Sequence, residues 1–355
     1  MKLLKYLISC SLITLMAVSC EKGLDPINSV PAQPDMDGPE LEITFPIEGK
    51  TVVSPDEPAT VTFKLLATDD AELGSVVLEL NGTVIANITS FLDYRRLDLK
   101  YNYAGMTAGD YTLKATATDL LGNSVNQSVS FKKVTAPVYE PMDGEVLYFP
   151  LDGFYLDLIT GNELTVNGAP SFTAGKVNDC YQGATDAYLS YPAASLTTSR
   201  EFSVCFWYKI NADPVRGGIM AISPVGDSRN VGLRMFRENS GDLQNIGLNF
   251  GDGAAEVWLN PFVQVPVDQD WIHIAISIST TKATIYVDGA IAPMTAEVET
   301  TGVDWTGCDG LSIGSGMPNF IYWEHKSDLS LYDEIHFFKK GLTAAEVLSI
   351  YEAGK

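Results

Sequence analysis

The stretch that decides the fold is Leu311 to Gly354, LSIGSGMPNFIYWEHKSDLSLYDEIHFFKKGLTAAEVLSIYEAG. It begins as a glycine-punctuated strand, continues through an aromatic loop and returns as a strand around residues 332–337. A helix should follow, because Thr343 is a good N-cap and Glu346, three residues later, completes a capping box. Gly354 lies where helices commonly end with glycine. A single helix after a run of strands predicts an all-β domain whose last element is helical.

Upstream of this stretch, five groups of residues have the apolar pattern of strands. They are LYFPLDG at 147–153, GKV at 175–177 with YLSY at 188–191, FSVCFWYK at 202–209, DWIHIA at 270–275 and ATIYVDG at 283–289. In this order they resemble the strands of LamG and concanavalin A-like lectin/glucanase domains. The resemblance covers residues 145–355 and implies a jelly-roll sandwich with a short C-terminal helix. Such domains bind glycans, cleave them or join proteins together, so the fold alone does not give the function.

Residues 41–134 alternate apolar and polar side chains, with turn residues between the runs, which predicts a β-sandwich of short strands. The predicted strands are 42–45, 59–67, 75–80, 83–89, 97–103, 109–119 and 124–132. Asn81-Gly82 predicts a type I′ hairpin, because both residues tolerate positive φ. The segments 67–82 and 109–123 resemble bacterial Ig-like domains, and Tyr111 is expected near a sheet corner with its hydroxyl on a backbone partner. Residues 135–144, with two prolines, are expected to be a linker.

Residues 1–20 have the pattern of an export signal, in which lysines precede a short apolar run. The run ends at Ala17-Val18-Ser19-Cys20, which resembles a bacterial lipobox. The resemblance implies that Cys20 is lipidated and anchors the mature chain on a membrane; an ordinary secretory signal is the alternative. Residues 21–40 are rich in Pro, Asp, Asn and Gly, which predicts a flexible stalk.

The chain is acidic, with 45 Asp and Glu against 23 Lys and Arg and a formal net charge of −22. Binding to nucleic-acid phosphates needs clustered Lys and Arg, so the composition excludes nucleic acid as a partner. The lipobox, stalk, sandwich and jelly roll together resemble the Bacteroidetes-type surface lipoproteins of polysaccharide uptake systems. The resemblance implies an outer-membrane protein that binds a polysaccharide or oligosaccharide, at the cell surface or facing the periplasm.

Catalysis is not expected from the sequence. A glycoside hydrolase needs two carboxylates facing one groove, which a strand supplies when acids lie at i, i+2 and i+4. Residues 145–355 contain no such pattern, and the adjacent Asp333 and Glu334 are expected on opposite faces. The histidines have no Cys or His at zinc-ligand spacing. A glycoside hydrolase with an unrecognised acid pair and an adhesive envelope protein that binds other proteins remain the alternatives.

A sugar site needs aromatic faces for the apolar side of the ring and polar groups for the hydroxyls. Aromatic residues flanked by Gly, Pro, Asn and Asp meet the first requirement. The candidate residues are Trp323, Tyr322, Glu324, His325 and Asn319, with Trp258, Asn260, Arg229 and Arg234 as the opposite wall. The alternative is that Trp323 only covers the core.

No cofactor is required by this interpretation, but the family resemblance implies a structural calcium ion near the first and last strands. Asp152 and Asp333 occupy the matching positions, whereas Gln182 replaces the acid expected in the next strand.

The remaining polar and aromatic residues of the predicted strands are expected to be structural. Trp207 and Trp271 are expected in the core, together with a structural His273, and His336 is expected at the solvent or at a sheet edge. An exported protein can form disulfides. Cys180 and Cys205 are expected on strands that can neighbour one another, and a bond between them is left open.

Overall fold

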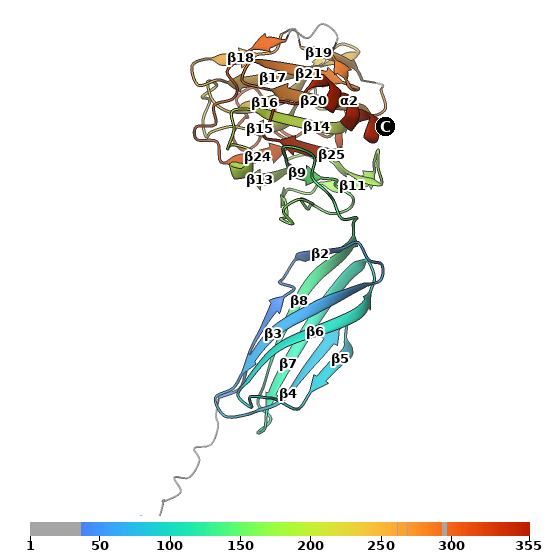
Figure 1. The fold of residues 1–355 in the computed structure, drawn as a ribbon, viewed down its shortest axis with the longest axis vertical. Helices are drawn as coiled ribbons and strands as arrows, with labels where there is room; N and C mark the ends of the chain where they lie inside the picture. Colours follow the sequence, from blue (N-terminus) through green and yellow to red (C-terminus); the bar gives the residue numbers. More distant parts are fainter. Residues whose placement is uncertain (1–36, 261, 268, 293–296) are drawn as a thin grey trace, which may run out of the picture. The chain divides into compact units, whose positions relative to one another are not determined.

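The computed structural model describes residues 37–355, except residues 261, 268 and 293–296 (Figure 1). The predicted export signal, Cys20 and most of the predicted stalk lie outside the described residues. The described chain divides into two compact units, one of residues 37–45, 63–101 and 113–128 and the other of residues 46–62, 102–112 and 129–355. Within the described residues, no helix is both long and apolar enough to cross a membrane.

The strands between residues 40 and 135 form two sheets, with the orders β1–β3–β6 and β2–β8–β7–β4–β5. Their bounds are β1 Glu40–Phe45, β2 Lys50–Ser54, β3 Ala59–Thr68, β4 Leu73–Leu80, β5 Thr83–Ile88, β6 Arg96–Met106, β7 Gly109–Asp119 and β8 Ser124–Thr135. All seven predicted strands are confirmed. The strand β2 was missed because it is short and its pattern is weak; it pairs in parallel with β8.

Two local predictions in this part are also confirmed. Asn81 and Gly82 have φ angles of 47° and 77°, as a type I′ turn between β4 and β5 requires. The Tyr111 hydroxyl donates a hydrogen bond to the Thr107 carbonyl at 3.0 Å. The resemblance of this part to Ig-like domains stays a prediction.

The C-terminal part is built of two larger sheets. The first sheet has the order β10–β13–β24–β15–β16–β17–β18, with β19 beside β17. Its strands are β10 Thr165–Asn167, β13 Tyr188–Pro192, β24 Gly310–Ile313, β15 Arg216–Ile222, β16 Leu233–Ser240, β17 Leu243–Gly251, β18 Glu256–Trp258 and β19 Val263–Pro266. A short 3₁₀ helix, η1, spans Ala193–Ser195.

The second sheet has the order β11–β12–β25–β14–β20–β21–β22, with β9 beside β25 and β23 beside β21. Its strands are β9 Glu145–Phe149, β11 Ser171–Ala174, β12 Asp179–Gln182, β14 Phe202–Lys209, β20 Ile272–Ile278, β21 Lys282–Val287, β22 Ala290–Ile291, β23 Val298–Glu299 and β25 Leu331–Phe338. These sheets confirm the all-β fold class and the sandwich predicted from the sequence.

The main core lies between these two sheets. Met235 and Leu248 of the first sheet and Phe206 and Ile274 of the second belong to one buried apolar cluster. The opposite face of the second sheet carries helix α2, Ala344–Ala353, whose Val347 is buried in a second cluster. Both faces of β14 and β20 are therefore covered, which explains why nearly every residue of these two strands is buried.

Helix α2 begins as predicted. The Thr343 side chain accepts a hydrogen bond from the Glu346 backbone N–H, and the Glu346 carboxylate accepts one from the Thr343 backbone N–H at 2.8 Å. This capping box satisfies two backbone donors that would otherwise lack partners, which is worth about 1 kcal/mol. Gly354 is the C-cap of the helix.

The expectation that Cys180 and Cys205 lie on neighbouring strands is wrong, because β25 separates β12 from β14. Both are buried free thiols, so the bond that the sequence left open is absent. Trp271 precedes β20 and is only half-buried, so it is not a core residue of that strand. Trp207, by contrast, is 4% exposed, as expected.

Candidate functional site

An aromatic cluster lies on the face of the first sheet that points away from the main core. Its centre is Phe236 of β16, whose neighbours in register are Gly218 of β15 and Gly247 of β17. A Cβ atom on Gly247 would lie 2.6 Å from the Phe236 ring, and one on Gly218 would lie 2.1 Å from the backbone nitrogen of Gly316. The two glycines therefore make room for the ring and for the loop after β24 to lie directly on the sheet.

The outer part of the cluster is partly exposed. Trp258, Phe262, Tyr322 and Trp323 are half-buried and pack against Phe236 and its buried neighbours. The Trp258 and Trp323 rings are stacked, with their centroids 5.2 Å apart and an interplanar angle of 26°.

A charged pair borders the stacked tryptophans. The Arg229 guanidinium lies 5.3 Å from the Trp323 ring centroid, within the range of a cation–π interaction. Arg229 also forms an ion pair with Glu256 at 3.2 Å. Both side chains are partly exposed, so the cluster offers an aromatic surface next to hydrogen-bonding groups that a ligand can reach.

Most of the residues predicted from the sequence lie in or beside the aromatic cluster, but some of them make structural contacts and are not on its surface. Tyr322, Trp323, Trp258 and Arg229 meet in the cluster. Trp323 covers a small core and remains partly exposed, so its contact with a sugar stays a prediction. Asn319 is half-buried and donates through its side-chain amide to the Ser223 carbonyl at 2.7 Å.

Glu324 and Asn260 are exposed beside the cluster rather than within it. Glu324 has a φ angle of 65° in the turn that follows Trp323. Asn260 follows Trp258 by two residues and is exposed. These two side chains are therefore available to a ligand only at the edge of the cluster.

His325 and Arg234 are not on the surface, contrary to the prediction. His325 is 1% exposed, stacks on Phe320 and lies 3.1 Å from a Glu238 carboxylate oxygen. Burial lowers its pKa to about 3, with further lowering by nearby arginines, so the ring is neutral at pH 7. Sequence spacing could not reveal that the loop turns this residue inward.

Arg234 is fully buried beneath the loop between β15 and β16. Its guanidinium donates to the carbonyls of Ser228 at 2.6 Å and Val231 at 3.0 Å. It therefore orders the loop that presents Arg229 and cannot contact a ligand on the surface.

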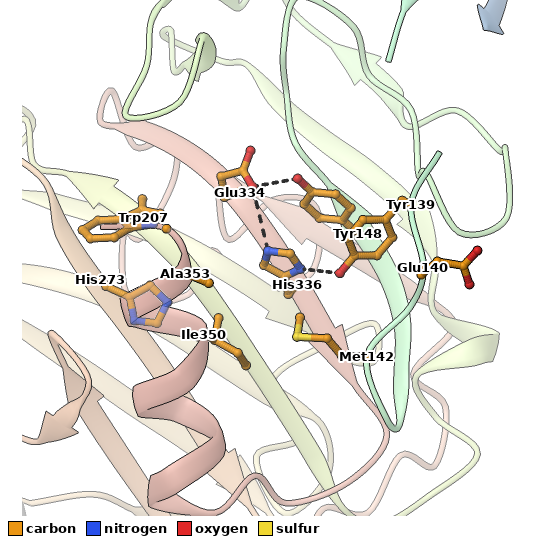
Figure 2. Close-up of a pocket in the computed structure, with 11 residues that line it drawn as sticks. Tyr139, Glu140, Met142, Tyr148, Trp207, His273, Glu334, His336, Ile350 and Ala353 are labelled. Carbon is orange, nitrogen blue, oxygen red and sulfur yellow. Dashed lines mark hydrogen bonds and ion pairs between the residues drawn. The ribbon is translucent and has the colours of Figure 1, made fainter. Parts of the chain in front are cut away.

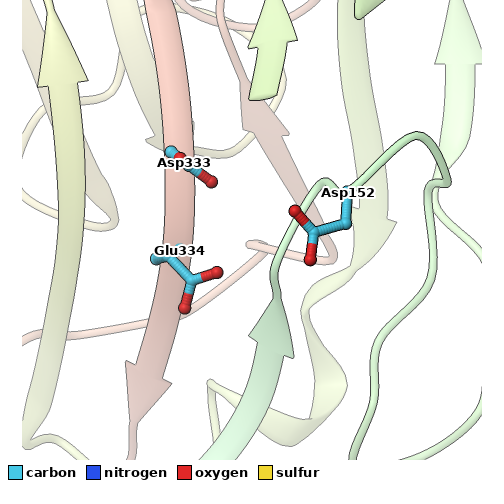
Figure 3. Close-up of side chains that lie close together, drawn as sticks. All are labelled: Asp152, Asp333 and Glu334. Atoms are coloured by element: carbon cyan, nitrogen blue, oxygen red, sulfur yellow. The ribbon is translucent and has the colours of Figure 1, made fainter. Parts of the chain in front are cut away.

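A second group of polar residues lies at the second sheet, where the carboxylates of Asp152, Asp333 and Glu334 converge (Figure 3). One oxygen from each lies within 4.8 Å of the others. The prediction that Asp333 and Glu334 point to opposite faces is wrong, because β25 contains a bulge at this point.

The three acids are held in an unfavourable electrostatic environment. Asp333 is fully buried; its Oδ2 accepts hydrogen bonds from the backbone N–H groups of Lys176 and Val177, while Oδ1 has no partner. Burial raises the pKa of Asp333 to about 8, and the charges of Glu334 and Asp152 add to the effect. Burial also raises the pKa values of Asp152 and Glu334.

These residues fit a hard divalent cation such as Ca²⁺, which prefers carboxylate and carbonyl oxygens. The unpartnered, buried Oδ1 of Asp333 is the observation that favours a cation. Gln182, in β12, is exposed, and Glu334 is the third carboxylate of the cluster. The sequence predicted Asp152 and Asp333 but not Glu334, because only the bulge in β25 brings Glu334 to the same face.

His336 also differs from its predicted position. It lies in β25, which has β9 and β14 on its two sides, and it is 9% exposed. Its Nδ1 lies 2.7 Å from a carboxylate oxygen of the buried Glu145. Its ring stacks on Tyr148, and both rings are drawn in Figure 2. His273 is buried, as expected.

The comparison with protein families matches residues 183–348 to Laminin_G_3, the concanavalin A-like lectin/glucanases superfamily. These residues form a domain of that superfamily. The comparison with curated proteins gives no match.

The comparison with solved structures gives matches at low identity. Domain 4 of AbnA, a GH43 extracellular arabinanase from Geobacillus stearothermophilus, solved in complex with arabinotriose, is 16% identical, with a TM-score of 0.46 over 58% of this chain and 98% of that chain. The binding domain of botulinum neurotoxin DC, solved in complex with rat synaptotagmin II, is 12% identical, with a TM-score of 0.43 over 60% of this chain. The match spans 52% of that toxin chain, about half its length.

Proposed function

We propose that this chain is a non-catalytic carbohydrate-binding protein of the bacterial cell envelope. In this proposal a lipid on Cys20 holds it at the outer membrane, where it serves polysaccharide uptake. The observation that carries the proposal is the partly exposed Trp258–Trp323 pair beside Arg229 and Glu256. The match of residues 183–348 to a lectin/glucanase superfamily supports it.

The proposed binding surface has both chemistries that a sugar needs. The apolar face of a pyranose or furanose ring packs against the partly exposed aromatic rings, and its hydroxyls exchange hydrogen bonds with Arg229, Glu256 and the exposed Asn260. A shallow surface with one or two stacking rings provides only a few kcal/mol, so dissociation constants of about 10 μM to 1 mM are expected.

The acid cluster is a poor catalytic pair, which supports a non-catalytic role. Retaining glycoside hydrolases place two reachable carboxylates about 5 Å apart on either side of the glycosidic bond. Asp333 is fully buried and bonded to two backbone N–H groups, so a polysaccharide cannot reach it.

We propose instead that Asp152, Asp333 and Glu334 hold a structural calcium ion. The ion would neutralise acids that burial makes costly to ionise, and it would connect β25 to the turn after β9. Backbone carbonyls or water would have to complete the six to eight oxygen ligands of Ca²⁺.

A glycan array probed with the purified chain tests the proposed function. Binding to a defined set of plant or microbial polysaccharides, with no release of reducing ends, is the expected result. The absence of any carbohydrate ligand at millimolar concentration would contradict it, as would a stoichiometric protein partner that sugars do not displace.

A further inference from the structure

The second sheet carries a pocket of about 280 Å³ on its face toward helix α2 (Figure 2). Strands β14, β20 and β25 form its floor, and its walls come from the end of α2 and from residues 139–142. Its lining comprises Tyr139, Glu140, Met142, Tyr148, Trp207, His273, Glu334, His336, Ile350, Ala353 and Gly354. The aromatic cluster belongs to the other sheet, so the two sites are separate.

The lining favours a cation. It contains the carboxylates of Glu140 and Glu334 and three aromatic side chains, and none of the described lining residues is lysine or arginine. Trp207 already attracts an ammonium group, because Lys176 Nζ lies 4.5 Å from its ring centroid. A ligand amine would meet the same kind of surface.

Hydrogen bonds fix the carboxylate side of the pocket. The Tyr148 hydroxyl donates to Glu334 Oε2 at 2.7 Å. His336 Nδ1 lies 2.7 Å from Glu145 Oε1, which orients the ring so that Nε2 lies 4.0 Å from Glu334 Oε2. Glu334 is therefore held in place by groups behind it, as a preformed site requires.

The other side of the pocket holds an unsatisfied polar atom. His273 is 2% exposed, and its Nδ1 has no hydrogen-bond partner. Burial lowers the pKa of His273 to about 4, so the ring is neutral at pH 7. A ligand hydroxyl satisfies this nitrogen in either tautomer, because a hydroxyl can both donate and accept.

The two polar sides set the size of the ligand. His273 lies in β20 and Glu334 in β25, with β14 between them, which places their strands roughly 10 Å apart. The volume is just below the roughly 300–1,000 Å³ of sites for drug-sized molecules, so a single small ring fits.

We propose that this pocket binds a small amino sugar, with its ammonium on Glu334 and the aromatic rings and a hydroxyl on His273 Nδ1. The proposal does not depend on the glycan surface at Trp258 and Trp323. It concerns the calcium-free chain, because a calcium ion held by Glu334 would compete with the ammonium group.

Glucosamine and glucose are the matched probes, since they differ only at C2, where glucosamine has an ammonium group in place of the glucose hydroxyl. Each is titrated into the full chain at pH 7 with a chelator present, and binding is followed by ligand-observed NMR. Glucosamine should bind at least about tenfold more tightly than glucose, the effect of one charge-assisted hydrogen bond. Glu334→Gln should remove this preference.

Two further variants keep the test independent of folding. Glu140→Gln, at an exposed position of the lining, should weaken glucosamine binding and leave glucose binding unchanged. Glu352→Gln removes an exposed acid of α2 that does not line the pocket. This variant should change neither glucosamine binding nor glucose binding. Melting temperatures show whether each variant is folded.

Equal affinity for the two sugars, no binding of glucosamine, or a preference that persists in Glu334→Gln would overturn the proposal. Loss of glucosamine binding in Trp323→Ala would also overturn it, because the amine would then bind at the aromatic cluster.

Discussion

The carboxylates of Asp333 and Glu334 lie within 4.8 Å of each other, although adjacent residues of a regular strand point to opposite faces. The register of β25 against β14 explains the difference: Cys205 is opposite His336 and Trp207 is opposite Asp333, so Glu334 and Ile335 together face Phe206. Glu334 has a φ angle of 51°, as a residue in a bulge can. The bulge thereby creates the acid cluster.

Without calcium, the acid cluster should make the stability of the protein depend on pH. The pKa of Asp333 is about 8 in the folded chain and about 4 in the unfolded chain. Between these values the folded chain binds the extra proton, so the contribution of Asp333 to stability is fully present below pH 4 and is lost as the pH rises to about 8. With a chelator present, Asp333→Asn should make the melting temperature depend less on pH between about pH 4 and pH 8. An unchanged slope would show that Asp333 is not the group responsible.

Calcium should stabilise the protein through the same three acids. Free calcium at 100 times its dissociation constant adds about 2.7 kcal/mol to the free energy of unfolding. This gain is measurable as a higher melting temperature. Asp152→Asn and Glu334→Gln should abolish this increase. Asp270→Asn, an exposed acid paired with Lys209, should keep it. If the melting temperature of the wild-type chain does not respond to millimolar calcium, the proposed site is wrong.

A buried ion pair should contribute strongly to the stability of the C-terminal sandwich. Arg237 and Asp328 are both fully buried and 2.9 Å apart, and the hydroxyls of Tyr208 and Tyr332 donate to the same carboxylate. Asp328→Ala should lower the free energy of unfolding by about 3–5 kcal/mol, because it leaves the Arg237 charge unpaired. Chemical denaturation measures this. Lys282→Ala, in an exposed pair with Glu297, should cost less than about 1 kcal/mol.

Local signals predicted much of the fold. Asn81-Gly82 and the Thr343–Glu346 capping box specify their turn and helix start through neighbouring residues, and both are confirmed. Features that depend on distant partners were not visible. The burial of Arg234 depends on a loop that folds over it, and the separation of Cys180 from Cys205 depends on the order of strands in a sheet.

The sequence identified which residues form the candidate site better than it identified what each of them does. Aromatic residues among loop signals identified Tyr322, Trp323 and Trp258, which do meet in space. Their shared contact, Phe236, was missed, because an aromatic residue in an apolar strand is typical of the core. Sequence alone does not show which face of β16 is covered by the other sheet and which by a loop.

Trp323→Ala should affect both binding and stability. The ring is half-buried against Phe236 and Phe320, so its loss should cost about 1–3 kcal/mol, less than the 3–5 kcal/mol of a fully buried aromatic residue. It should also abolish glycan binding. A variant that is destabilised but binds normally would show that Trp323 only covers the small core.

Calorimetric titration of the best glycan-array ligand into the wild-type chain and Trp258→Ala tests the central claim most directly. Trp305→Phe is the control, since Trp305 is half-buried in the same domain but packs on Phe202, outside the cluster. The account predicts at least about a tenfold loss of affinity in Trp258→Ala, from the loss of one stacking ring, and wild-type affinity in Trp305→Phe. Wild-type affinity in a folded Trp258→Ala would contradict it.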